Sequence, residues 1–168
     1  MKLSEWRYCP RCGAPLVLRR KSGGIRPVCH ACHFVHFADP KVTVAVLIER
    51  EGRVLLGKRA VNPRRGFWCL PGGFVDYGEL VREAAAREAL EETNLKVTIG
   101  ELLGVEDWDD EESGKKGIAL FFCAEVEEHH AEPVAADDML ELDWFARDQL
   151  PPMAFASHEM MIKGTSGT

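Results

Sequence analysis

Apolar and polar stretches divide the chain into short strands, two helical segments and polar turns. Residues 42–48 (VTVAVLI) form an unbroken β-branched run that is typical of a strand buried on both faces. Residues 54–59 (VLLGKR) predict its partner in a hairpin, across a turn at 49–53. Three later runs predict further strands, at 96–105, 118–126 and 141–145.

Helices are expected in two segments. The main one covers 79–93 and follows a short strand and a tight turn (FWCLPGG), and the other covers 154–163. The polar run at 107–117 (DWDDEESGKKG) is too long for a simple turn, so we expect a loop that lies over a site. Residues 164–168 (GTSGT) are expected to form a frayed tail.

Length and composition are those of a globular protein. The 168 residues suffice for one domain, or one domain with a small module, and 46% of them are hydrophobic. No run approaches the roughly 18 apolar residues of a membrane span, and the first residues lack the apolar core of a signal peptide. We therefore expect a cytoplasmic protein without a membrane segment.

Charge is distributed unevenly along the chain. Residues 1–39 contain seven Lys or Arg and two Asp or Glu, a net charge of +5, whereas the remaining residues contain 14 and 25, a net charge of −11. This asymmetry predicts two modules, residues 1–39 and residues 40–168. The acidic second module argues against broad nucleic-acid binding, which requires neutralisation of phosphates, although the basic first module could contact an anionic substrate.

The first module contains two CxxC pairs, in CPRCG at 9–13 and CHAC at 29–32. Their spacing predicts a tetrahedral zinc site formed by Cys9, Cys12, Cys29 and Cys32. With SGG at 22–24 as a turn between two short strands, this module is expected to be a zinc ribbon. Four thiolates leave no open position, so the zinc should be structural. The alternatives are a redox dithiol, free cysteines, or competing ligands among His30, His33 and His36.

Three carboxylates share one side of the main predicted helix. At about 100° per residue, Glu91 and Glu92 lie about 60° and 40° to either side of Glu88. Ala84 and Ala85 fall on the same side, whereas a solvated acidic face normally lies opposite the apolar stripe. Glu88 and Glu92 form a like-charge pair, with no Lys or Arg four residues further on. A divalent ion that prefers oxygen ligands, Mg²⁺ or Mn²⁺, is favoured there over a plain solvated face.

The same segment resembles the Nudix box, G-x5-E-x7-R-E-U-x-E-E-x-G-U, in which U is apolar. The matching residues are, in order, Gly73, Glu79, Arg87, Glu88, Ala89, Glu91, Glu92 and Leu95. Asn94 departs from the pattern, because it stands where the last glycine belongs. That position follows the last helical turn, where a left-handed backbone is expected and asparagine is tolerated next after glycine. The chain is thus identified as a member of the Nudix family.

This resemblance implies an α/β fold, a Nudix α/β/α sandwich with a mixed β-sheet, here preceded by the zinc ribbon. It also implies hydrolysis of nucleoside diphosphates linked to another moiety, with Mg²⁺ or Mn²⁺ bound by Glu88, Glu91 and Glu92. Such ions would neutralise the diphosphate and lower the pKa of a bound water.

The other residues of the box are expected to shape the loop. Arg87 and Glu79 are eight residues apart, so a direct helical pair is excluded unless Glu79 lies in a bent loop. The family pattern suggests that both support this loop. Gly72 and Gly73 would allow a tight turn and keep a backbone carbonyl near a metal, with a plain turn as the alternative.

The zinc knuckles ahead of the box resemble the NADH pyrophosphatase branch of the family. DMLELDWF at 138–145 is similar to an acidic segment there, which implies a metal-binding role for Asp138, with Glu141 as the competing candidate. The SQPWPFP signature of that branch is missing, since no proline lies between 72 and 132. The ribbon, the box and the closing AFAS segment at 154–157 look more like the FAD and ADP-ribose pyrophosphatase of plant plastids.

We therefore expect a nucleotide small molecule as substrate, ADP-ribose or FAD first and NADH behind them. The base that activates water would be Glu88 or a carboxylate of residues 106–112. Trp68, Trp108 and Phe155 could stack on adenine, although core packing is the stronger reading for Trp68, and Trp108 is expected to be exposed in its acidic loop. A homodimer is common in the family.

Two other classes of function compete with this enzyme. One is an ADP-ribose sensor without catalysis, and the other is an enzyme that removes nucleotide caps from RNA and holds the transcript with its basic ribbon. Sensors usually lose carboxylates of the box, which are intact here. The acidic body and the missing signature weigh against the RNA-directed enzyme.

Overall fold

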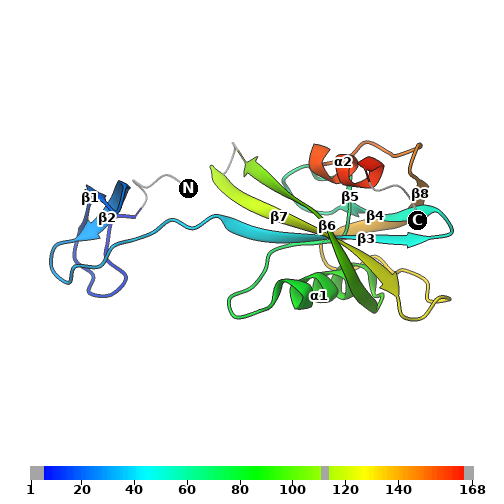
Figure 1. Ribbon diagram of the computed structural model, residues 1–168, viewed down its shortest axis with the longest axis horizontal. Coiled ribbons are helices and arrows are strands. Elements are labelled where there is room, and N and C mark those ends of the chain that lie inside the picture. Colours follow the sequence, from blue (N-terminus) through cyan, green and yellow to red (C-terminus); the bar gives the residue numbers. More distant parts are fainter. Residues whose placement is uncertain (1–5, 111–113, 165–168) are drawn as a thin grey trace. The chain divides into compact units, whose positions relative to one another are not determined.

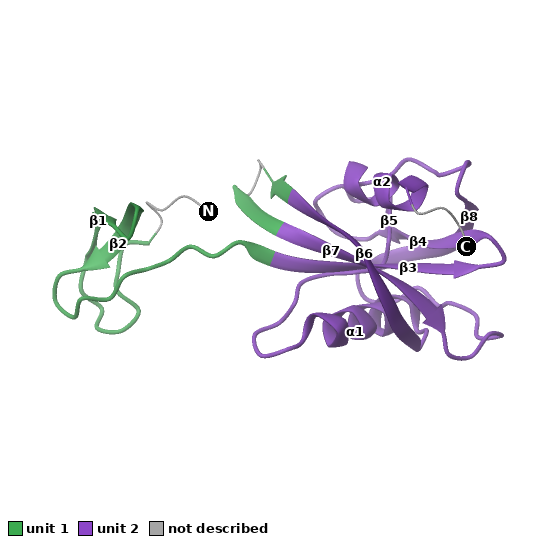
Figure 2. Ribbon diagram, viewed as in Figure 1, with its two compact units in different colours: residues 1–41, 108–117 green, residues 42–107, 118–168 purple. Residues whose placement is uncertain are grey.

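The computed structural model describes residues 6–110 and 114–164, whose helices and strands are labelled in Figure 1. The chain forms two compact units (Figure 2). One comprises residues 1–41 and 108–117, and the other comprises residues 42–107 and 118–168. In the described part of the chain, no helix is long and apolar enough to cross a membrane.

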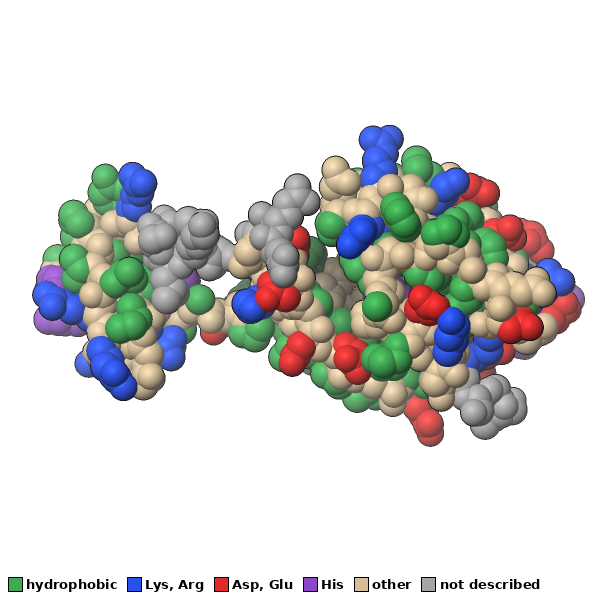
Figure 3. Space-filling model, turned by 90° about the horizontal axis from the view of Figure 1, so that it is seen from above, with side chains coloured by type: hydrophobic (Ala, Val, Ile, Leu, Met, Phe, Trp, Pro, Cys, Tyr) green, Lys and Arg blue, Asp and Glu red, His purple; other side chains and the backbone are tan. Residues whose placement is uncertain are grey.

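The cysteine-rich module contains a two-stranded antiparallel sheet, β1 (Leu16–Lys21) and β2 (Gly24–Cys29). Ser22 and Gly23 form the turn between these strands, with φ values of 49° and 81°. Positive φ at both positions suits a two-residue hairpin turn, so the predicted turn at 22–24 is confirmed. The basic side chains of this module lie at its surface beside hydrophobic ones (Figure 3).

The larger sheet has the strand order β5-β4-β3-β7-β6, and β8 pairs with β4. Its strands are β3 (Lys41–Arg50), β4 (Arg53–Arg59), β5 (Trp68–Cys69), β6 (Val97–Asp110), β7 (Lys115–Val126) and β8 (Met139–Ala146). Every predicted strand is present, and β3 is buried from Val44 to Ile48, as its unbroken apolar run predicted.

The glycine pair of the box lies against β3. The N–H groups of Val44 and Val46 donate to the carbonyls of Gly73 and Pro71, at 2.9 and 2.8 Å. Residues 71–73 therefore form ladder-like hydrogen bonds with a central strand, which fixes the backbone that leads into the first helix.

Two helices, α1 (Val81–Thr93) and α2 (Ala156–Gly164), lie on opposite faces of the larger sheet (Figure 1). Ala84, Ala85 and Ala89 of α1 are fully buried in the core cluster that includes β3. Small side chains let the helix approach the sheet closely at the density of a protein interior. The expected α/β/α sandwich, preceded by a small β module, is confirmed.

The ends of the helices differ slightly from the prediction. α1 begins two residues after Glu79, which belongs to the preceding loop, and ends at Thr93 as predicted. Asn94 follows with a φ of 58°, and its N–H donates to the Leu90 carbonyl at 2.8 Å. The expected left-handed residue is thus confirmed. α2 starts at Ala156, two residues later than predicted, and 165–168 of the predicted tail lie outside the described residues.

The predicted long loop at 107–117 is wrong over most of its length. β6 continues to Asp110 and β7 begins at Lys115, while 111–113 lie outside the described residues. Trp108 is therefore a half-buried strand residue and not an exposed loop residue, and a Cβ added at Gly117 would collide with its ring. Strand pairing depends on backbone hydrogen bonds, so a charged sequence can extend a hairpin.

Candidate active site

The three glutamates of the box differ in burial. Glu92 and Glu88 are 3% and 9% exposed, whereas the side chain of Glu91 is 47% exposed. Glu88 and Glu92 share the buried side of α1 with Ala84 and Ala85, as the helical spacing predicted. Two carboxylates are thus withdrawn from water on a helix that packs closely on the sheet.

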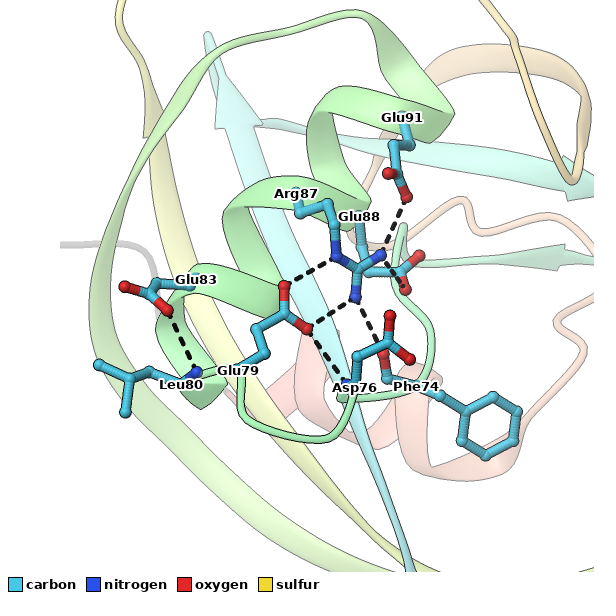
Figure 4. A network of polar contacts seen from close by, with 8 residues as sticks. All are labelled: Phe74, Asp76, Glu79, Leu80, Glu83, Arg87, Glu88 and Glu91. Carbon is cyan, nitrogen blue, oxygen red and sulfur yellow. Dashed lines mark hydrogen bonds and ion pairs between the residues drawn. The ribbon is translucent and has the colours of Figure 1, made fainter.

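Arg87 connects the loop before α1 to the glutamates of the helix (Figure 4). Its Nε and Nη2 donate to the two carboxylate oxygens of Glu79, at 2.8 and 3.0 Å. Its Nη1 donates to Glu88 and Glu91, both at 2.9 Å, and Nη2 also donates to the Phe74 carbonyl at 3.0 Å. One guanidinium therefore uses both edges of its planar fork to hold the loop and the helix together.

This network corrects the expectation that the glutamates have no nearby cation, and it meets the condition set for a pair between Arg87 and Glu79. The glutamates are not without a cation, because Arg87 lies one residue before Glu88 and four before Glu91. The prediction considered cations placed after the glutamates and missed the one placed before them. Glu79 lies in the bent loop, which is the one condition under which a direct pair with Arg87 was expected.

The loop itself is closed by short-range hydrogen bonds. Glu79 accepts the N–H of Asp76 at 3.2 Å, and Glu83 accepts the N–H of Leu80 at 3.2 Å (Figure 4). The Arg87 guanidinium keeps the pKa of Glu79 below its usual value, so this carboxylate stays charged.

Each glycine of the pair makes room for a neighbouring group. Gly72 has a φ of 153°, and a Cβ there would collide with the Val44 carbonyl, while its N–H donates to Glu92 Oε2 at 2.7 Å. A Cβ at Gly73 would lie 2.5 Å from the Glu88 carboxylate. The backbone therefore forms a cradle around the two buried carboxylates, which a side chain would fill.

The buried carboxylates have the chemistry of ligands for a hard cation. Burial raises the pKa of Glu88 and raises that of Glu92 to about 8. A nearby divalent ion would reverse these shifts by favouring the charged form. Among the described residues, the box glutamates do not already converge on one point, since Glu88 faces Arg87 and Glu92 faces Gly72.

Two aspartates before β8 lie near the box. The charge of Asp138 contributes to raising the pKa of Glu92, and the charge of Asp137 contributes to raising that of Glu88. Glu141 instead pairs with a lysine of β4 at 3.3 Å, in an exposed position. The structure thus groups Asp138 with the glutamates and Glu141 with the surface of the sheet.

A hollow of about 400 Å³ brings together two segments that the sequence analysis singled out. It is lined by Glu106, Asp107, Phe155, Ala156, Ser157 and Met160. Trp68 does not line it and instead packs edge-on against Phe145 in the core, at 4.8 Å between ring centroids. Trp108 also does not line it. Of the three aromatic residues considered for stacking, the hollow contains Phe155.

Sequence reasoning missed two residues near these features. The Arg59 guanidinium lies over the Phe155 ring, 5.2 Å from its centroid, and its charge lowers the pKa of Glu92 relative to burial alone. His158 accepts the N–H of Leu70 through Nδ1 at 3.1 Å. Neither contact has a local signal, because the partners are far apart in sequence and belong to different elements.

The four predicted zinc ligands converge. The Sγ atoms of the cysteine cluster all lie within 4.8 Å of one another, and two pairs, Cys9 with Cys32 and Cys12 with Cys29, are 3.5 Å apart. Thiolates around a tetrahedral Zn²⁺, with bonds of about 2.3 Å, lie at similar separations. In the residues that the structure describes, this is the one compact set of potential metal ligands, and no histidine belongs to it.

Two protein families match separate parts of the chain. Residues 39–163 match the NUDIX domain, and residues 7–38 match the Nudix N-terminal zinc ribbon. A crystal structure of a NUDIX hydrolase from Nitrosomonas europaea superposes with a TM-score of 0.81 and 34% identity, covering 94% of this chain and 88% of that one.

Two relatives differ in the activity that their names give. The ADP-ribose pyrophosphatase of Methanocaldococcus jannaschii is 40% identical over 127 residues, which cover 76% of this chain and 73% of that protein. The NAD-capped RNA hydrolase NudC of Vibrio cholerae is 28% identical over 148 residues, covering 88% of this chain and 52% of that protein. The chain thus spans about half the length of this second relative.

Proposed function

The chain belongs to the Nudix hydrolase family, and from this premise we propose that it cleaves ADP-ribose or FAD and releases AMP. Hydrolysis of a nucleoside diphosphate derivative follows from the family and its relatives, while the choice of substrate is the proposal. ADP-ribose is favoured because the relative named for that substrate is 40% identical.

The observation that carries the proposal is the burial of Glu88 and Glu92 beside a glycine cradle. Two nearly inaccessible carboxylates on one helix are costly unless positive charge compensates them. Arg87 reaches Glu88, whereas Glu92 accepts a backbone N–H. Oxygen ligands of this kind suit Mg²⁺ or Mn²⁺, which we propose as the catalytic ion.

We assign the ion to Glu88, Glu91, Glu92 and Asp138. When bound, it would neutralise the diphosphate and lower the pKa of a water molecule. Arg87 orients Glu88 and Glu91, and its bond to Glu79 keeps the preceding loop in place. The Gly72 N–H orients Glu92. These contacts fix the ligands before substrate arrives, which is how a protein stabilises charge efficiently.

The hollow beside α2 suits the base of the AMP half. Phe155 offers a ring for stacking, and the carboxylates of Glu106 and Asp107 can accept hydrogen bonds from an exocyclic amine. The Arg59 guanidinium lies over this ring, and its charge is near enough to lower the pKa of Glu92, so this side chain can contact a phosphate of the substrate.

A substrate panel with a matched pair of glutamate variants tests the proposal. The protein is incubated with Mg²⁺ or Mn²⁺ and, in separate reactions, with ADP-ribose, FAD, NADH and NAD-capped RNA. Release of AMP, of reduced NMN from NADH, or of NMN from capped RNA is followed. Glu92→Gln should lower kcat roughly 100-fold or more, because it removes a charge that orients the ion. Glu125→Gln, at an exposed glutamate of β7 outside the box, should retain wild-type activity.

The outcomes separate the candidate functions. Turnover of ADP-ribose or FAD that depends on Glu92 supports the proposal. Absence of turnover with every substrate, or equal rates for Glu92→Gln and wild type, contradicts it. Binding of ADP-ribose without cleavage would instead indicate a sensor.

A second candidate is hydrolysis of NADH or of NAD-capped RNA. It is favoured by the match to the NudC relative, which covers 88% of this chain. Residues 6–38 also contain six Lys or Arg and no Asp or Glu, a composition suited to contact with phosphates. Faster release of reduced NMN from NADH, or of NMN from capped RNA, than of AMP from ADP-ribose would establish this candidate.

A cytoplasmic location and a homodimer stay predictions from the sequence. All six cysteines are free thiols in the structure, which a reducing compartment allows. Light scattering after size-exclusion chromatography would measure the mass in solution and test the dimer.

A further inference from the structure

A half-buried histidine on the last helix bonds to the segment that leads into the proposed metal-binding helix. His158 Nδ1 accepts the N–H of Leu70 at 3.1 Å. Its ring packs against Phe121 and Phe155, with centroids 5.2 and 5.0 Å apart. Burial and the charge of Arg59 lower the pKa of His158 to about 3, so the ring stays neutral and Nδ1 remains an acceptor.

Further hydrogen bonds tie the residues just before α2 to the same segment. The Trp68 N–H donates to the Pro152 carbonyl at 3.1 Å, and the Ala154 N–H donates to the Trp68 carbonyl at 2.7 Å. Together with the imidazole bond, they attach residues 152–158 to residues 68–70. Of the three, the bond from His158 is the one made by a side chain, so it can be removed by substitution without changing the backbone.

The attached segment ends at a ligand of the box. Two residues after Leu70, the Gly72 N–H donates to Glu92 Oε2 at 2.7 Å. Pro71 lies between them with a fixed φ, and its carbonyl accepts the N–H of Val46 at 2.8 Å. A shift of the Leu70 peptide is therefore passed to Gly72 through a stiff link.

We propose that His158 is a positioning residue that holds residues 70–72 so that the Gly72 N–H stays directed at Glu92, and thereby sets the affinity of the box for a divalent ion. This inference rests on the proposed function, in which Glu92 binds that ion. Groups that orient metal ligands typically change metal affinity 10- to 100-fold when removed.

Ordinary core packing is the competing explanation for His158. A leucine at this position would preserve apolar packing but leave the buried Leu70 N–H without its acceptor. An asparagine places its side-chain oxygen near the position of Nδ1 and so can restore that acceptor in a smaller side chain. If packing alone matters, asparagine should be the worse replacement; if the acceptor matters, it should be the better one.

The experiment compares His158→Leu, His158→Asn and a packing control, Ile162→Ala, at a fully buried residue of the same helix. Mn²⁺ binding is measured without substrate by electron paramagnetic resonance, and amide exchange of Leu70 and Gly72 by NMR with a diamagnetic sample. His158→Leu should raise the Mn²⁺ Kd roughly 10-fold and speed exchange at Gly72, and His158→Asn should restore both. With ADP-ribose at fixed Mn²⁺, kcat should fall more than KM changes.

Wild-type Mn²⁺ affinity in a folded His158→Leu variant would overturn the inference, as would an equal loss of affinity in Ile162→Ala. If His158→Leu does not fold, His158→Gln replaces it, because glutamine carries the amide oxygen one bond further from the backbone than asparagine does. Equal Mn²⁺ affinities of the Asn and Gln variants would then overturn the inference. Failure of the wild type to cleave any substrate contradicts the proposed function alone, because Mn²⁺ binding and amide exchange still test the role of His158.

Discussion

Glu92 is 3% exposed, and the bond that it accepts from the Gly72 N–H compensates part of the hydration lost on burial. Burial is the main reason that its pKa rises to about 8, and the charges of Glu88 and Asp138 add to it. Without a bound ion, this residue therefore favours the protonated form at neutral pH. A divalent ion in the box would favour the carboxylate, so metal binding and proton release at Glu92 should be linked.

This linkage predicts how stability depends on pH when no Mg²⁺ or Mn²⁺ is present. Glu92 keeps its proton up to a pKa of about 8 in the folded state, but loses it near 4.5 in the unfolded chain. Between these values the folded state binds more protons, so the free energy of unfolding should fall as pH rises from about 5 to 8. The side chain of Glu92→Gln cannot ionise. Its free energy of unfolding should therefore exceed that of the wild type at pH 8, by at most about 5 kcal/mol.

Urea unfolding at pH 5, 6.5 and 8, in buffers without Mg²⁺ or Mn²⁺, measures this difference. Adding Mg²⁺ should flatten the slope of the wild type and leave that of Glu92→Gln almost unchanged. Parallel pH profiles of the two proteins would contradict the prediction.

At the same scale, sequence reasoning located the residues of the box but not all of their partners. The side of α1 that carries Glu88 and Glu92 followed from a period of 3.6 residues, which is a property of the helix itself. The bonds of Arg87 to Glu79 and Phe74 depend on how the preceding loop bends, and the bond of His158 to Leu70 joins residues 88 positions apart. No local pattern encodes contacts that arise when separate elements pack.

Among the elements, the end of α1 shows how a departure from the box pattern is accommodated. Asn94 has a φ of 58°, and its N–H closes the last turn on the Leu90 carbonyl. Asparagine tolerates this left-handed conformation better than most other residues with a Cβ atom, because its short polar side chain can form local hydrogen bonds.

Substitutions at Asn94 should therefore follow backbone preference. Asn94→Gly should be neutral or slightly stabilising, whereas Asn94→Ala should lower the free energy of unfolding by about 1 kcal/mol. Thermal unfolding by circular dichroism, with kcat for ADP-ribose as a check on the site, compares the pair. Equal stabilities of the alanine and glycine variants would show that the left-handed residue does not limit stability.

In the Nudix domain, strand prediction succeeded where one face or both faces of a strand were buried and failed at the accessible ends of β6 and β7. The run at 42–48 is buried from Val44 onward, so its apolar content was a sufficient signal. The ends of β6 and β7 near Trp108 and Lys115 are polar and mostly accessible, so hydrophobic alternation was weak there. The backbone ladder that extends this hairpin is independent of side-chain polarity, and composition therefore suggested a loop.

In the molecule as a whole, the two modules differ in their source of stability. The Nudix domain has a core that contains Val46, Ile48, Leu55 and Leu95, all fully buried. In the ribbon, β1 is almost entirely exposed, and buried side chains include Cys9 and Cys29 of the cysteine cluster. We therefore expect a module with so little apolar burial to depend on a bound ion for its fold.

Loss of zinc should consequently unfold the ribbon and leave the Nudix domain folded. Cys29→Ser removes one of the four converging thiols, so we expect loss of zinc and of the thermal transition of the ribbon. Because a closed four-thiolate site is structural, kcat for ADP-ribose should stay within about 3-fold of wild type. Cys123→Ser is the matched control, since Cys123 lies outside the cluster and accepts the Glu101 N–H through a sulfur that a hydroxyl can replace. Zinc content, the calorimetric melting transition and kcat are measured on the same samples.

Complete loss of zinc with an unchanged melting transition would contradict a structural role. A loss of kcat as large as that of Glu92→Gln would instead place the ribbon in the catalytic machinery.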